Sequence, residues 1–256
     1  MKGVDTLAWY NKGKIEKIKK EVDMSRLPIH IAFIMDGNGR WAKRRFLTKN
    51  MGHNEGAKVL KRMVRVCGDI GVKNLTFYAF STENWARPKE EVDTLMGLLL
   101  DFLVNYEKEM EGKDIRIRVI GDLKALSKEI QEQARIVENA TCKNKSLEVN
   151  VAINYGGRDE IIEASKSLAR KAVKGEIDPE NIDAKIFGAE LYTKGTPDPD
   201  LFIRTSGECR LSNFLLWQSA YSEFYFTQVL WPDFNDEELF KAILNYQQRD
   251  RRFGGR

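Results

Sequence analysis

Cysteine, histidine and long hydrophobic runs are scarce in this sequence of 256 residues, which has three cysteines and two histidines. Three cysteines cannot all pair, and no C-x-x-C spacing is present to hold zinc. The longest apolar run, Met96 to Val104, is interrupted by Asp101 and is too short to span a bilayer. The N-terminal region lacks the apolar core of a signal peptide. We therefore expect a protein of a reducing compartment, the cytoplasm.

The excess of one sign of charge is also small, because the sequence has 42 Lys+Arg and 38 Asp+Glu, a net charge of +4. This excess is too small to indicate a nucleic-acid partner, and no basic stripe interleaved with aromatics supports one. Hydrophobic residues make up 42% of the chain, enough for a substantial core. We expect one domain over residues 26–256, preceded by a helical extension over residues 1–25. The lysine-rich extension fits a solvated surface helix better than a membrane-surface helix.

Apolar segments alternate with amphipathic segments along the rest of the chain. Alternation of strands with helices predicts a single α/β domain with a mainly parallel sheet. A glycine at position 71 marks the end of one helix, as expected for a left-handed cap. The sequence predicts strands over 30–35, 75–80, 115–120, 147–153, 201–203 and 224–226, and helices over 57–70, 89–110 and 158–173.

Three polar segments follow predicted strands: Asp36–Arg40, Ser81–Arg87 and Arg204–Ser212. Parallel α/β sheets bind ligands beyond the carboxyl ends of their strands. The placement of the three segments therefore predicts one shared site.

The first segment, Asp36-Gly37-Asn38-Gly39-Arg40, combines glycines with both signs of charge. Glycines let the backbone approach an anion, and Arg40 can pair with phosphate oxygens. Asp36 would repel a bare phosphate, so its presence suggests an intervening Mg²⁺. The alternative is a tight turn that uses these residue types for ordinary conformational reasons.

The second segment places Asn84, Trp85 and Arg87 close together, a combination that suits a ligand both apolar and anionic. Its alternative is a helix cap made by Ser81 and Thr82.

The third segment holds Arg204 and Arg210 with a glycine and two serines, which again suggests phosphate binding. The alternative is an arginine-rich surface loop. Apolar residues on both sides of the segment favour a place near the core.

Four further residues stand out singly. His30 begins a strand and is expected to be structural, whereas His53 is as well suited to a structural as to a catalytic role. Glu223 lies in an aromatic run and is either an exposed strand residue or a metal ligand. Cys67 lies on an apolar helix face and is expected in the core.

Taken in order, the motifs of residues 28–255 resemble the cis-prenyltransferases, above all the bacterial undecaprenyl diphosphate synthases. The resemblance extends over nearly the whole chain and leaves out only the N-terminal extension. The matching motifs are HIAFIMDGNGRW (30–41), GH (52–53), YAFSTENWARP (78–88), NYGGR (154–158), IRTSGE (203–208), RLSNFLLW (210–217), WPDF (231–234) and RRFGG (251–255).

The resemblance implies an enzyme that extends an allylic diphosphate, with farnesyl diphosphate as primer, by isopentenyl diphosphate units in cis geometry. The implied product is undecaprenyl diphosphate, a membrane carrier lipid for cell-wall synthesis. Mg²⁺ on Asp36 and Glu223 is the implied metal, and a homodimer with a six-stranded sheet and an apolar tunnel is the implied architecture. The implied substrate-binding residues are Gly37, Asn38, Gly39, Arg40, Trp41, Lys49, His53, Ser81, Thr82, Glu83, Trp85, Arg87, Arg204, Arg210, Leu211 and Ser212, and the implied catalytic residues are Asp36, Asn84 and His53.

Two positions depart from the family pattern. Lys49 stands where bacterial relatives often have arginine, so the charge is kept but the bidentate fork is lost. Cys209 lies at a variable position within the third segment, and we assign it no role. The terminal Arg252-Phe253-Gly254 matches a motif that reaches the partner subunit's site in the family.

Chemistry narrows the roles of two residues. An amide cannot hold a proton, so we expect Asn84 to orient substrates while a diphosphate oxygen or His53 accepts the proton.

The apolar face of the helix at 89–110 either lines the tunnel or packs in the core.

Two rival functions have weaker support. An aspartate-based phosphatase would need a second aspartate where Asn38 stands. A non-catalytic partner subunit would lack the first polar segment, which is complete here.

Overall fold

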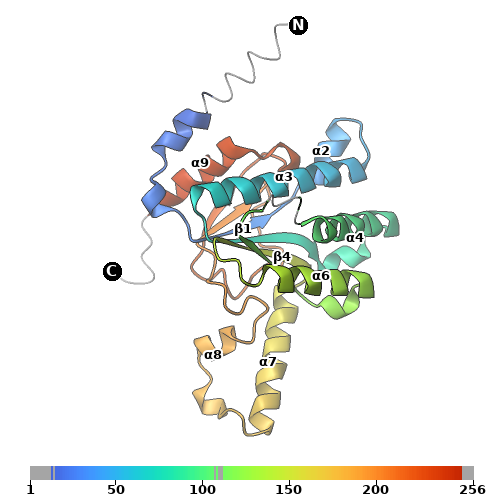
Figure 1. The fold of residues 1–256 in the computed structure, drawn as a ribbon, viewed down its shortest axis with the longest axis vertical. Coiled ribbons are helices and arrows are strands. Elements are labelled where there is room, and N and C mark those ends of the chain that lie inside the picture. The colour runs from blue at the N-terminus through green and yellow to red at the C-terminus, as the bar shows by residue number, and fades with distance from the viewer. Residues whose placement is uncertain (1–12, 14, 107, 109–111, 250–256) are drawn as a thin grey trace.

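The computed structural model describes residues 13, 15–106, 108 and 112–249, and its centre is one sheet of six strands. The strands follow the order β3-β4-β2-β1-β5-β6, and every neighbouring pair is parallel. The predicted α/β class and mainly parallel sheet are therefore confirmed. All carboxyl ends share one edge of the sheet (Figure 1). The strands are β1 (His30–Ile34), β2 (Asn74–Ser81), β3 (Ile115–Ile120), β4 (Leu147–Tyr155), β5 (Leu201–Arg204) and β6 (Glu223–Phe226).

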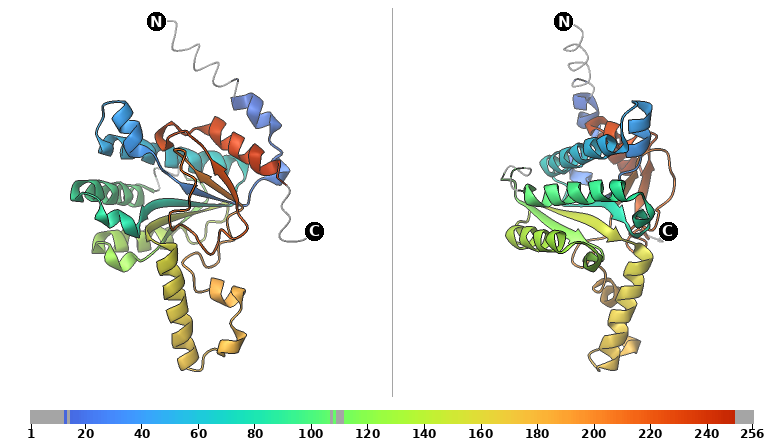
Figure 2. Two further views of the ribbon diagram at one scale, coloured as in Figure 1. Left: turned by 180° about the vertical axis from the view of Figure 1, so that it is seen from behind. Right: turned by 90° about the vertical axis from the view of Figure 1, so that its right-hand side faces the viewer.

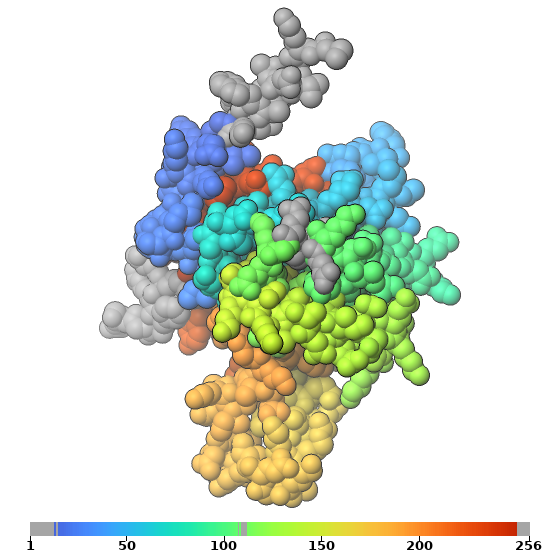
Figure 3. Space-filling view, viewed as in Figure 1, coloured from blue at the N-terminus to red at the C-terminus, as the bar shows by residue number. Residues whose placement is uncertain are grey.

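Helices connect the strands. One group, α3, α4, α6 and α9, packs in the same core cluster as one face of the sheet. Helices α7 and α8 instead project from the body as an arm, which all three ribbon views and the space-filling view show (Figures 1, 2 and 3). The helices are α2 (Asn38–Arg44), α3 (Lys49–Ile70), α4 (Lys89–Val104), α6 (Lys128–Thr141), α7 (Gly157–Val173), α8 (Ala184–Gly188) and α9 (Asp236–Gln247), with 3₁₀ turns η1 (Met24–Arg26), η2 (Thr82–Ala86), η3 (Leu123–Ala125), η4 (Pro179–Asn181) and η5 (Trp231–Asp233).

The two faces of the sheet have different cores because side chains alternate along each strand. In β1, Ile31 and Phe33 enter the large cluster under the helices, whereas Ala32 and Ile34 enter a smaller cluster on the other face. The alternating apolar residues of β4 all join the large cluster, as predicted. Cys67 is fully buried there, which confirms its core role.

Helix ends differ most from the sequence prediction. Helix α3 begins at Lys49 rather than at residue 57, because Thr48 caps it by accepting a hydrogen bond from the Met51 amide. Its predicted end is confirmed, with Gly71 in the left-handed conformation at φ 100°. Helix α4 ends at Val104, before the predicted end at residue 110; residues 107 and 109–111 lie outside the described range.

Part of the N-terminal extension is described. Residues 15–21 are helical, and Ile15, Ile18 and Val22 pack against the large core cluster. Within the described part of the chain, no helix combines the length and apolar character needed to cross a bilayer.

Candidate active site

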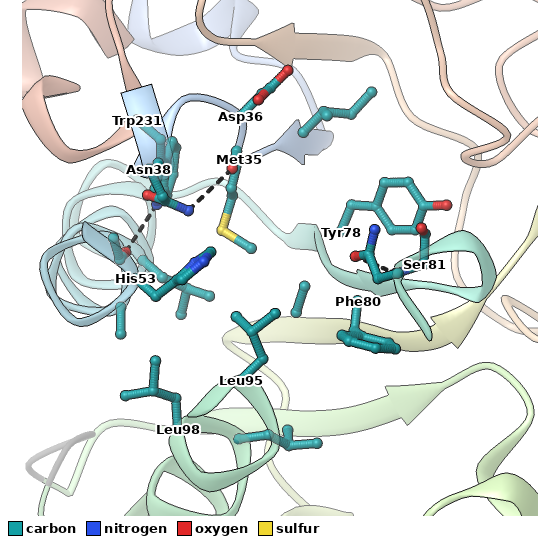
Figure 4. Close-up of a pocket in the computed structure, with 18 of the residues that line it drawn as sticks. Met35, Asp36, Asn38, His53, Tyr78, Phe80, Ser81, Leu95, Leu98 and Trp231 are labelled. Carbon is teal, nitrogen blue, oxygen red and sulfur yellow. Dashed lines mark hydrogen bonds between the residues drawn. The ribbon is translucent and has the colours of Figure 1, made fainter. Parts of the chain in front are cut away.

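A cavity of about 1370 Å³ opens at the carboxyl edge of the sheet. All three polar segments line it, as their positions after parallel strands predict. Helices α3 and α4 form its remaining walls. Figure 4 shows Asp36, Asn38, His53 and Ser81 around the same hollow, with Leu95 and Leu98 at its lower end. The cavity therefore joins a polar end to an apolar end.

Asp36 and Arg204 form the centre of the polar end. The Arg204 Nη2 donates to Asp36 Oδ2 at 3.1 Å, and Arg40 Nη2 lies 3.3 Å from the same oxygen. Burial opposes ionisation of Asp36, but the hydrogen bond and charge of Arg204, with the charge of Arg40, outweigh it and hold the pKa of this carboxyl below its usual value. Asp36 is therefore a fixed negative charge at neutral pH.

Arg204 also organises the third segment. Its side chain is 4% exposed, and its Nη1 donates to the Arg210 carbonyl oxygen and to Ser212 Oγ, the latter at 2.8 Å. Its Nε is buried and has no partner among the described residues. A buried donor without an acceptor is costly, so this atom is suited to a ligand acceptor. Arg210 itself is exposed and pairs with Glu208 at 2.5 Å.

The first segment is shaped by close packing. Gly37 has φ 109°, and a Cβ there would lie 3.0 Å from Leu230 and 3.1 Å from the Ser206 Cβ. Only glycine fits this conformation and space without strain. Arg40 is fixed toward the third segment because its Nη1 donates to the Ser206 carbonyl oxygen at 3.0 Å. The packing thereby joins the first and third segments.

A second group of charged side chains faces the cavity from α3, α4 and the second segment. Glu91 Oε2 accepts from Lys49 Nζ at 3.1 Å, and Glu91 Oε1 accepts from Arg87 Nη1 at 2.9 Å and from His53 Nε2 at 3.3 Å. Burial is the main reason why the pKa of His53 is lowered, although Glu91 opposes the shift. A carboxylate can only accept, so His53 carries its proton on Nε2 and leaves Nδ1 as an acceptor.

Asn84 has one end of its amide already engaged. Its Oδ1 accepts from the Ser81 amide at 3.1 Å, so the side chain helps to cap η2. The side-chain nitrogen has no partner among the described residues and is available as a donor. Asn84 can therefore orient an anion and cannot take a proton from it.

The apolar end lies between the sheet and two helices. Helix α4 contributes Leu95, Leu98, Leu99 and Phe102 to the cavity wall, and β4 contributes Val151 and Ile153. On the same helix, Val92 and Leu103 belong to the core cluster and do not line the cavity. Both predicted uses of the wide apolar face thus occur, and Leu99 and Phe102 belong to the core cluster while also lining the cavity.

Comparison with known proteins decides the family. The undecaprenyl diphosphate synthase family of prenyltransferases matches residues 34–254. The chain is 51% identical to the isoprenyl transferase of Bacillus subtilis and 50% identical to that of Heliobacterium mobile, and each alignment covers at least 91% of both chains. This chain belongs to the undecaprenyl diphosphate synthase family.

Solved structures agree with the family. Lavandulyl diphosphate synthase from Lavandula x intermedia, in complex with dimethylallyl diphosphate, is 40% identical with a TM-score of 0.86. A "probable undecaprenyl diphosphate synthase" from Campylobacter jejuni is 35% identical with a TM-score of 0.73. Each comparison covers 89% of this chain and 98% of the other. The chain is therefore a cis-prenyltransferase enzyme, as predicted.

Most of the substrate-binding and catalytic residues implied by the family resemblance line the prenyltransferase cavity, and four do not. Trp41 donates to Asp233 at 2.7 Å, Trp85 donates to Asn154 at 2.8 Å, and Thr82 lies 3.4 Å from Asp159. Leu211 packs against the smaller core cluster. Those that line the cavity are Asp36, Gly37, Asn38, Gly39, Arg40, Lys49, His53, Ser81, Glu83, Asn84, Arg87, Arg204, Arg210 and Ser212.

Glu223 is not brought to Asp36. It is the first residue of β6 and pairs in register with Leu201, at the amino edge of the sheet, whereas Asp36 follows the carboxyl end of β1. Its carboxylate pairs with Arg249 at 2.6 Å. Within one subunit, Glu223 and Asp36 therefore lie at opposite edges of the sheet, and their pairing at a metal stays a prediction. The Arg252-Phe253-Gly254 motif lies outside the described residues.

The other histidine is structural, as predicted. His30 Nδ1 lies 2.6 Å from the Pro197 carbonyl oxygen and Nε2 lies 2.7 Å from Thr76 Oγ1. Burial lowers the pKa of His30 to about 4.

Arg158, Tyr78 and Glu91 are among the cavity residues to which the sequence analysis gave no role. Arg158 could have been found, because it follows β4 through two glycines and so has the same position after a strand as the three segments. Tyr78 stacks on Phe214 inside a strand pattern that looks purely structural. Glu91 resembles any acidic residue in the first turn of a helix, and only the folded structure brings three donors to it.

Proposed function

We propose that this enzyme condenses isopentenyl diphosphate repeatedly onto farnesyl diphosphate and releases undecaprenyl diphosphate, a carrier lipid for cell-wall synthesis. One observation carries the proposal: a single cavity has arginines at one end and leucine and phenylalanine at the other. A growing prenyl diphosphate needs both, because its head is an anion and its tail is apolar. The names of the relatives support the same product class.

The residues present fit a Mg²⁺ ion held by Asp36. Mg²⁺ is commonly held by one or two carboxylates together with substrate phosphates, and Asp36 is an ionised oxygen donor beside the arginines. No group of three or more His, Cys, Asp or Glu side chains suited to a metal occurs among the described residues, so substrate oxygens would complete the coordination. When bound, the ion would offset the negative charge that develops on the departing diphosphate.

The side chains of the polar end have separate tasks in this proposal. Arg40 and the loop around Gly37 stabilise the departing allylic diphosphate by hydrogen bonds and charge. Arg204, Arg210 and Ser212 hold the isopentenyl diphosphate, with the unpartnered Arg204 Nε as a donor.

The proton released after condensation needs an acceptor. The nitrogen of Asn84 orients the diphosphates, since its oxygen is engaged in the cap of η2. Nδ1 of the neutral His53, or a diphosphate oxygen, accepts the proton.

We also propose that the active form is a homodimer. Among the described strands, β6 has a neighbour on its β5 side alone, and Phe226 on it and Tyr221 before it are 40% and 65% exposed. Exposed aromatics beside an open edge are typical of an interface. Light scattering at micromolar concentration should give twice the chain mass of 29.5 kDa, and a monomer that is fully active would contradict this part of the proposal.

The decisive experiment mixes the purified protein with farnesyl diphosphate, labelled isopentenyl diphosphate and Mg²⁺, and reads the extracted product by chain length. We expect a long apolar product that is absent when a chelator is added. Dimethylallyl and geranyl diphosphate, tested in parallel, identify the preferred primer. A folded protein that makes no product with any primer would contradict the proposal and favour a partner-subunit role.

A further inference from the structure

Glu91 lies where three elements of the cavity meet. It is in the first turn of α4, its residue exposure is 9%, and it lines the cavity. Lys49 at the start of α3, His53 one turn later and Arg87 before α4 all donate to its two carboxylate oxygens. Within the described part of the chain, none of these three donors has another side-chain hydrogen bond.

The family resemblance implies that these three donors also bind substrate. Their side chains line the cavity together with Arg40 and Asn84. A carboxylate that takes one donor on one oxygen and two on the other presents the same kind of acceptor as a phosphate group. These donors cannot form full hydrogen bonds to Glu91 and to a substrate oxygen at the same time.

We propose that Glu91 is an internal substitute for the substrate diphosphate: it holds Lys49, His53 and Arg87 in the empty cavity, and a bound allylic diphosphate displaces it. The inference rests on the proposed function for the identity of the ligand. Without Glu91, two cations and a buried imidazole would face one another with no anion between them. Glu91 thus keeps the empty site assembled and weakens binding of every anion that competes for the same donors.

Because Glu91 is on α4, its displacement by a diphosphate also affects the apolar end of the cavity. Leu95 and Leu99 follow it at one and two helical turns and line the apolar end of the same cavity. Displacement of Glu91 removes the hydrogen bonds that join the first turn of α4 to Lys49 and His53 of α3, while the apolar packing of the two helices remains. Occupation of the polar end is thereby coupled to the helix that forms the wall of the apolar end.

The test measures binding of inorganic diphosphate by calorimetry in Mg²⁺-free buffer, so that neither turnover nor a metal on Asp36 contributes. The variants are Glu91→Gln, which keeps the shape and removes the charge, and Glu90→Gln. The second is a matched control, because Glu90 makes the same change of charge in the same helical turn and lies outside the cavity lining. We expect Glu91→Gln to bind diphosphate about tenfold more tightly and Glu90→Gln to remain within about twofold of the unmodified protein.

Unchanged or weaker diphosphate binding by Glu91→Gln, with an unchanged melting temperature, would overturn the inference. Equal tightening by both variants would also overturn it, because the effect would then be general charge and not competition. If Glu91→Gln melts at a lower temperature, Glu91→Asp provides the second measurement: a retained charge must leave diphosphate binding weaker than in Glu91→Gln. The prenyl transfer assay is scored separately, so loss of the proposed function and loss of this inference are distinguishable.

Discussion

The polar and apolar ends of the cavity are built by different kinds of interaction. At the polar end, directional bonds position the side chains: Arg204 donates to Asp36, to Ser212 and to the Arg210 carbonyl oxygen. At the apolar end, Leu95, Leu99 and their neighbours are placed by the packing of α4, which is non-directional. The difference predicts that residue identity matters at the polar end and that side-chain volume matters at the apolar end.

The largest effect is expected at Asp36. Asp36→Ala removes the oxygen donor for Mg²⁺ and leaves the buried Arg204 charge without its partner. We expect the rate of a single condensation to fall by at least about 10³-fold. Asp69→Asn is the control, because Asp69 pairs with Lys113 outside the cavity, and its rate should be unchanged. A rate within tenfold of normal for Asp36→Ala would contradict the central place given to this carboxylate.

Removal of the charge at Arg204 should have the next largest effect. Arg204→Met keeps much of the length of the side chain and loses every donor. We expect KM for isopentenyl diphosphate to rise about 100-fold, with the distribution of product lengths unchanged once product forms. Steady-state kinetics with saturating farnesyl diphosphate measure the change. An unaltered KM would show that the third segment does not bind isopentenyl diphosphate.

A buried polar residue far from the cavity should affect stability and not catalysis. The pKa of His30 is about 4 in the folded protein and about 6.5 when unfolded, so the unfolded chain binds the proton first as pH falls. This part of the stability is present above the unfolded pKa and is lost as pH falls toward the folded value. We expect urea unfolding to show a loss of about 2 kcal/mol between about pH 7.5 and about pH 5. His30→Gln should reduce the dependence of the free energy of unfolding on pH over this range. An equal dependence in the variant would show that other groups cause it.

The smallest effect on rate, with a clear effect on product, is expected at the apolar end. Leu99→Trp adds volume to the cavity wall, so the product should be shorter while the first condensation stays within about threefold of normal. Val104→Trp makes a matched change on the exposed side of the same helix and should leave product length unaltered. Reversed-phase separation of labelled products gives both answers.

The same contrast explains what the sequence could and could not predict. All six strands and the meeting of the three polar segments were predictable, because strand alternation and the parallel edge place Asp36, Asn84 and Arg204 by topology alone. Within one subunit, Glu223 starts β6 and lies at the opposite edge of the sheet from Asp36, so its place at a metal stays a prediction. The role of Glu91 depends on three partners from separate elements, and no local pattern carries that information.

One cavity binds the diphosphates at its polar end, and the volume of its apolar end limits the length of the prenyl product. The most direct test determines single-condensation rate and product length together in Arg204→Met and Leu99→Trp. The account predicts that Arg204→Met slows condensation at subsaturating isopentenyl diphosphate without shortening the product, and that Leu99→Trp shortens the product without slowing condensation. A Leu99→Trp enzyme that makes product of unchanged length, or an Arg204→Met enzyme that changes length at normal rate, would contradict it.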